Sequence, residues 1–110
     1  MENTILTVEA LLAGEQATFE IKIPKELLAQ QEIENEETSV KIKPLTIGSY
    51  LLIIKAAKED SALIPLLMIK ESMVNPKLTL VQVKQMKVGL VEYLVEQIKT
   101  ISGIKKKSPQ

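Results

Sequence analysis

Residues 44–103 decide the fold of this chain, and they read PLTIGSYLLIIKAAKEDSALIPLLMIKESMVNPKLTLVQVKQMKVGLVEYLVEQIKTISG. Apolar residues recur in this stretch at spacings of three and four, which is the period of a helix that buries one face. Thr46 and Thr79 are placed to cap helices at their N-termini, and Gly103 to end the last one. We therefore expect helices over about 47–58, 61–74, 80–86 and 88–101.

Two shorter segments before this stretch have a different period. Residues 17–23 alternate apolar and polar side chains, with Phe19, Ile21 and Ile23 on one face, and residues 39–43 do the same. Alternation at every second residue is typical of a half-buried strand. Two short strands are not stable alone in water, so we expect them to pair and to pack on the helices. The predicted fold class is α+β, mainly α: a small two-stranded antiparallel sheet packed on a bundle of three to four short helices.

The remaining segments complete the predicted organisation. One or two turns of helix are expected over residues 7–14 with Thr7 as the N-cap, and a short helix over residues 25–33 that ends in an acidic loop. The chain is long enough for one domain with a modest core. We predict a single domain over residues 1–103, with an accessory strand-containing part over residues 1–44 and a helical part over residues 45–103. A disordered basic tail is expected over residues 104–110.

The composition narrows the choice of chemistry. The chain of 110 residues has no Cys and no His, so thiolate nucleophiles, imidazole bases and the common zinc sites are all missing. All 14 basic residues are Lys and only 3% of residues are aromatic, so the chain lacks the arginine fork and the stacking surface that nucleic-acid binding favours. We expect no catalytic residue, no cofactor, no metal site and no nucleic-acid partner.

The same reading predicts where the protein works. The first residues lack the basic start and apolar run of a signal peptide. Charged residues from Lys55 to Asp60 interrupt the longest apolar run, which stays well short of the roughly 20 residues of a membrane span. We expect a cytoplasmic protein with no membrane partner.

The apolar excess of the helices is the main functional indication. Between residues 63 and 74, apolar side chains nearly encircle the predicted helix and leave Lys70, Glu71 and Ser72 as its polar face. A central core helix explains this pattern, but a small domain has too few layers to hide every such helix. We therefore predict a non-enzymatic protein-binding module, with these candidate partner-binding residues: Tyr50, Ile53, Leu63, Leu67, Met68, Met73 and Met86.

Several short phrases occur in a familiar order. Lys-x-Lys-Pro-Leu-Thr at residues 41–46 is followed by an apolar helix, an acidic break, a second apolar helix and Asn-Pro-Lys-Leu-Thr at residues 75–79. A linker over residues 83–89 then leads to Leu-Val-Glu-Gln-Ile at residues 94–98 and to Ser102-Gly103. Over about residues 40–103 this layout resembles the tail assembly chaperones of long-tailed bacteriophages and prophages.

The resemblance implies a function. It implies a non-enzymatic chaperone that binds the apolar, helical tape measure protein and keeps it soluble during tail assembly in the bacterial host cytoplasm. Helix-in-groove capture of a long client would use the apolar helical surface described above. The alternative is a small homodimeric structural or regulatory subunit that uses the final helix and has no chaperone activity. Self-association is compatible with both hypotheses.

Overall fold

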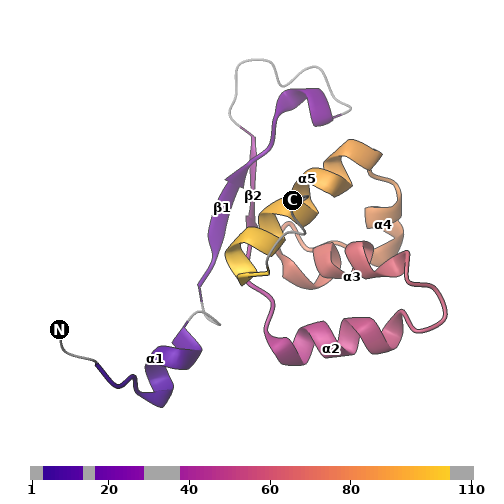
Figure 1. Cartoon of the computed structure of the whole chain (residues 1–110). Coiled ribbons are helices and arrows are strands. Elements are labelled where there is room, and N and C mark those ends of the chain that lie inside the picture. Colours follow the sequence, from indigo (N-terminus) through magenta and orange to yellow (C-terminus); the bar gives the residue numbers. More distant parts are fainter. Residues whose placement is uncertain (1–3, 14–16, 29–37, 105–110) are drawn as a thin grey trace, which may run out of the picture.

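The computed structural model describes residues 4–13, 17–28 and 38–104. In chain order (Figure 1) its elements are α1 (Val8–Leu12), β1 (Phe19–Lys22), the 3-10 helix η2 (Lys25–Leu27), β2 (Ser39–Ile42), α2 (Ile47–Ala56), α3 (Leu63–Ser72), β3 (Met73–Asn75), α4 (Leu80–Lys84) and α5 (Val88–Ser102). The predicted class, α+β and mainly α, is confirmed. The helix expected over residues 25–33 is short, and its second half lies outside the described residues, as do residues 105–110 of the tail predicted over 104–110.

Capping residues define the helix boundaries as the sequence indicates. The Thr46 hydroxyl accepts a hydrogen bond of 3.1 Å from the Ser49 amide at the start of α2. At α4 the Thr79 hydroxyl accepts from the Gln82 amide, and the Gln82 side chain accepts from the Thr79 amide at 2.9 Å, which makes a reciprocal capping box. Gly103 ends α5 in the left-handed conformation, with φ of 76°.

The sheet has three antiparallel strands in the order β1-β2-β3, so the predicted two-stranded sheet is wrong by one strand. Ile42 of β2 pairs with Phe19 on one side and with Met73 on the other. The helix expected to reach residue 74 ends at Ser72, and the next three residues form β3. Asn75 precedes a proline, which disfavours helical geometry, and Ile42 offers Met73 an extended partner.

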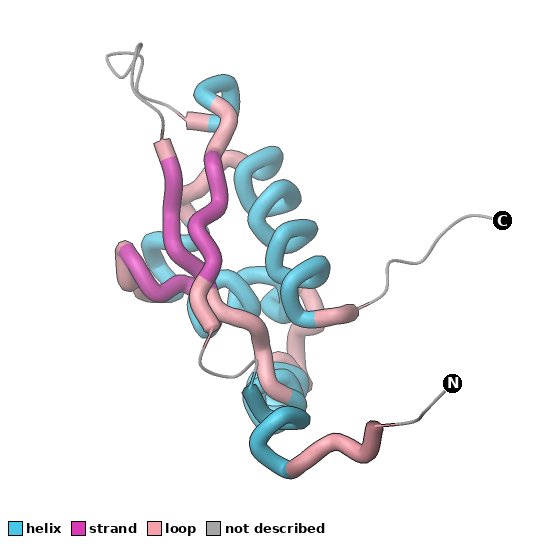
Figure 2. Tube along the Cα trace, turned by 90° about the vertical axis from the view of Figure 1, so that its left-hand side faces the viewer, coloured by secondary structure: helices cyan, strands magenta, loops and turns pink. Residues whose placement is uncertain are grey.

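Helices α2 to α5 lie to one side of the sheet (Figures 1 and 2), and α3 packs against α2, α4 and α5. Strands and helices share one core, whose buried side chains are Ile23, Ile42, Ile53, Ala57, Met68, Ile69, Met73, Val83, Leu94 and Ile98. In the described part of the chain, no helix is long and apolar enough to cross a membrane.

Two serine hydroxyls form hydrogen bonds between the helical layer and the connection from β2 to α2. The Ser72 hydroxyl donates to the Lys43 carbonyl at 2.5 Å, and the Lys43 amide donates back to the Ser72 carbonyl at 2.9 Å. The Ser102 hydroxyl, at the end of α5, accepts from the Leu45 amide at 2.9 Å. The sequence places Ser72 on the polar face of its helix, but it is fully buried, and this backbone partner satisfies its buried hydroxyl.

The last helix is oriented as its sequence pattern predicts. Leu94 and Ile98 are buried, and Glu92 is exposed. Glu96, one turn after Glu92 on the same helix, is half-buried.

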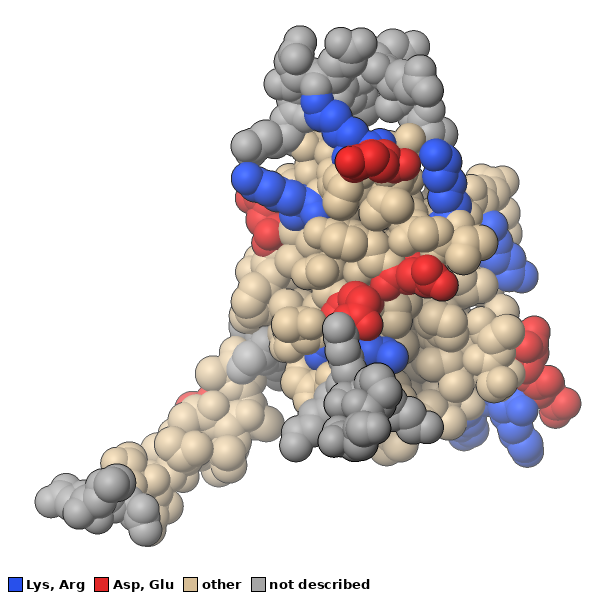
Figure 3. All heavy atoms as spheres, turned by 45° about the horizontal axis from the view of Figure 1, so that its top comes forward, with Lys and Arg blue, Asp and Glu red and all other residues tan. Residues whose placement is uncertain are grey.

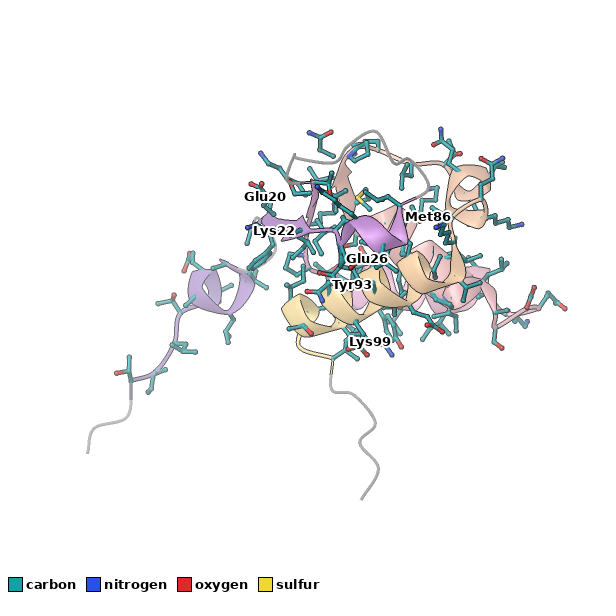
Figure 4. The ribbon with its side chains drawn as sticks, turned by 90° about the horizontal axis from the view of Figure 1, so that it is seen from above. Glu20, Lys22, Glu26, Met86, Tyr93 and Lys99 are labelled. Atoms are coloured by element: carbon teal, nitrogen blue, oxygen red, sulfur yellow. The ribbon has the colours of Figure 1, made fainter. Side chains whose placement is uncertain are left out.

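The side chain of Tyr93 on α5 connects this helix to the sheet by a hydrogen bond. The Tyr93 hydroxyl donates to the Lys22 carbonyl at 2.7 Å, and Figure 4 shows the two labelled residues on neighbouring elements, α5 and β1.

Candidate protein-binding surfaces

The outer side of α2 carries an exposed apolar stripe. Ile47, Leu51 and Ile54 follow one another at helical spacing, and Ile47 and Leu51 are 71% and 58% exposed. On a different side of the helix, Ile53 and Ala57 are buried in the core. α2 therefore has one apolar face that contributes to folding and a second that faces solvent. We call Ile47, Leu51 and Ile54 the α2 stripe.

A second apolar feature is a hollow between α2 and α3. It has a volume of about 160 Å³ and is lined by Ser49, Leu52, Ile53, Ala56, Leu67, Lys70 and Glu71. Leu52 is 68% exposed at its edge, whereas Ile53 is buried beneath it. An apolar cavity of roughly 150 Å³ holds a molecule the size of benzene, so this hollow is large enough for one aliphatic side chain. We call it the α2–α3 groove.

The third feature is the N-terminal segment, residues 4–13, which we call the arm. It contains α1, and none of the residues of α1 is buried. Five aliphatic side chains of the arm are exposed, from 59% to 91% of their surface: Ile5, Leu6, Val8, Leu11 and Leu12. Figures 3 and 4 both show the arm standing away from the body of the molecule. This apolar segment has no packing partner within the described chain that buries any of its side chains.

The structure divides the predicted partner-binding residues into two groups. Ile53, Met68 and Met73 are buried in the hydrophobic core, so the structure does not present them at the surface where the sequence places them. The other four are half-buried: Tyr50, Leu63, Leu67 and Met86. Tyr50, Leu67 and Met86 pack against the core. Of these, Leu67 lines the α2–α3 groove.

Sequence reasoning missed the most exposed apolar residues. Ile47, Leu51 and Ile54 recur at helical spacing in the sequence, but periodicity alone does not say which of two apolar faces of a helix is covered. The arm was recognised only as a short helix, because nothing in residues 4–13 indicates whether the segment packs on the domain. The signal that was available is the narrow apolar face formed by Val8, Leu11 and Leu12.

Two other hollows have mixed linings of charged and apolar residues, and one of them, of about 450 Å³, is lined by Pro65, Val91, Glu92, Val95, Glu96 and Lys99. The other, of about 540 Å³, has Lys43, Lys70, Lys77 and Glu71 among its lining residues. Within the described ranges, no group of Cys, His, Asp or Glu is arranged to hold a metal ion.

No known family model matches this chain, and comparisons with curated proteins and with solved structures give no match either.

Proposed function

We propose that this protein is a non-enzymatic binding module that captures an apolar helical segment of another polypeptide. The observation that carries the proposal is the α2 stripe, in which Ile47, Leu51 and Ile54 are exposed at helical spacing on a helix whose other face is packed. Aliphatic side chains along a helix make contacts that depend little on direction, so such a surface accepts varied apolar sequences. A client with a long apolar helix would bind along it by side-chain packing.

The resemblance to tail assembly chaperones makes the client more specific. On this proposal the client is the tape measure protein of a phage or prophage tail, and the module keeps it soluble in the bacterial cytoplasm until the tail assembles. Support comes from the positions of the shared phrases, which coincide with structural junctions of this fold. Thr46 and Thr79 cap helices, and Ser102 fastens the end of α5 to the β2–α2 connection.

The proposed client binding is tested by co-expression with an apolar helical fragment of a tape measure protein from the same genome. We expect the wild-type protein to shift most of this fragment from the insoluble to the soluble fraction. Leu51→Glu places a charge in the α2 stripe and should abolish this effect. Val81→Glu is the matched control, because Val81 is 64% exposed on a different helix, α4, and should leave the effect unchanged.

Two outcomes of the co-expression experiment would contradict the proposal. One is a wild-type protein that leaves the fragment insoluble, and the other is a Leu51→Glu variant that solubilises the fragment as well as the wild type does. Far-UV circular dichroism of both variants checks that they remain folded. The gene neighbourhood tests the phage assignment separately, since a tape measure gene is expected directly downstream.

The alternative of a homodimeric subunit needs a different surface from the one first expected. Leu94 and Ile98 of α5 are buried inside the domain, so the apolar face of the final helix is not free to form a dimer. Any self-association would have to use the apolar surfaces that remain exposed.

A further inference from the structure

The arm cannot be stable as an isolated helix. α1 has five residues, whereas isolated helices shorter than about 12–15 residues are marginal in water. Thr7 supplies an N-cap by accepting from the Ala10 amide at 3.1 Å, but one cap does not offset the cost of forming so short a helix. The apolar face of the arm, formed by Val8, Leu11 and Leu12, therefore requires a surface to pack on.

The α2–α3 groove has the dimensions and chemistry to receive it. Its apolar part is formed by Leu52, Ala56 and Leu67, and its volume of about 160 Å³ suits one leucine side chain. Lys70 and Glu71 lie at the same hollow, and the single charged residue of the arm is Glu9. A leucine of the arm in the hollow would leave Glu9 at the polar edge of the helix, where Lys70 offers the opposite charge.

Several observations favour a second copy of the chain as the source of the arm. The arm stands off its own body in Figures 1, 3 and 4, and the radius of gyration of 16.0 Å exceeds the roughly 13 Å of a compact domain of this length. The arm also precedes β1, which is an edge strand of the sheet. Arm and groove are present on each copy, so an exchange between two copies forms two identical contacts and doubles the buried area.

We propose that α1 of each copy packs into the α2–α3 groove of the other, forming a two-fold dimer by reciprocal exchange of arms. Leu11, on the apolar face of α1, is the side chain that enters the groove, and Leu52 covers it from α2. Burial of apolar surface drives association, so two arms with several aliphatic side chains each supply the driving force for a dimer. This inference is separate from client binding, which uses the α2 stripe.

Sedimentation equilibrium of the full chain tests the exchange. We expect the wild type to have twice the chain mass of 12.2 kDa. Leu11→Asp in the arm and Leu52→Asp at the groove should each reduce the mass to that of one chain. Val88→Asp is the matched control, because Val88 is equally exposed but lies on α5, away from both surfaces, and this variant should remain a dimer.

Cysteine cross-linking then identifies whose arm occupies the groove. The chain contains no cysteine, so a Leu12→Cys and Ala56→Cys double variant introduces the only two thiols. Mild oxidation should give a covalent dimer on a non-reducing gel, and the double variant Leu12→Cys and Val88→Cys should not. A cross-linked monomer would show that each arm folds onto its own body and would overturn the exchange.

Other results also overturn the proposal: a monomeric wild type, or a dimer that survives Leu11→Asp. Failure of the exchange is distinguishable from failure of client binding. Leu11→Asp should remove the dimer and leave the fragment soluble in co-expression, whereas Leu51→Glu should leave the dimer intact and lose the client.

Discussion

Replacing Leu94 by alanine tests whether α5 holds the domain together as its packing indicates. Leu94 is 1% exposed and belongs to the shared core of helices and sheet. The change removes three carbon groups, which at about 0.8 kcal/mol each corresponds to a loss of about 2.4 kcal/mol of transfer free energy. The cavity left behind adds to this loss, because the neighbouring residues relax only in part. We expect a total of about 3–5 kcal/mol.

Urea unfolding followed by circular dichroism measures this change in the free energy of unfolding. For a domain of this size, 1 kcal/mol corresponds to about 4–8 °C in Tm, so the melting temperature should fall by at least about 12 °C. Glu92→Ala is the control on the same helix, because Glu92 is exposed, and its effect should stay within about 0.5 kcal/mol. A loss below 1 kcal/mol for Leu94→Ala would refute the reasoning, since it would mean that this face of α5 is not packed.

Four further stability predictions concern the ends of the helices, each measured by the same urea titration. Ser102→Ala leaves the half-buried Leu45 amide without its acceptor and should cost about 1–3 kcal/mol, and a neutral result would show that water replaces the hydroxyl. Gly103→Ala should destabilise the protein by about 1–2 kcal/mol because φ is 76° at this position. Gly48 lies in α2, and the nearest side-chain atom that a methyl group would meet there, Thr46 Oγ1, is 3.9 Å away. Gly48→Ala should therefore stabilise the protein by up to about 1 kcal/mol. Thr79→Ala removes the capping box of α4 and should cost about 0.5–2 kcal/mol, while Thr79→Ser should restore most of the loss.

The sequence predicted the helices well because their ends are marked by local chemistry. Thr46, Thr79 and Gly103 each act within a few residues of their own position, so a reader of the sequence has all the information needed. The third strand was missed for the opposite reason. Residues 73–75 become extended because Ile42, some thirty positions earlier, pairs with Met73, and no pattern within the segment itself indicates that partner.

The candidate site was harder to predict than the fold. Ile53 and Leu52 are adjacent aliphatic residues on one helix, yet one is buried and the other is exposed at the groove. Which of two apolar faces is covered depends on the elements that pack against the helix. For α2, the main packing partner is α3. Periodicity identifies both faces and cannot rank them.

The phrases that resemble a chaperone family and the surfaces proposed to bind partners are different residues. Thr46, Thr79 and Ser102 act through directed hydrogen bonds, which only a few residue types can make. The α2 stripe and the arm offer apolar area, which Ile, Leu and Val supply almost equally well. The residues that define the scaffold can therefore be recognised from the sequence, whereas the aliphatic residues proposed to bind a partner by packing cannot. For such a protein the decisive experiments are those that change the exposed aliphatic residues and leave the caps intact.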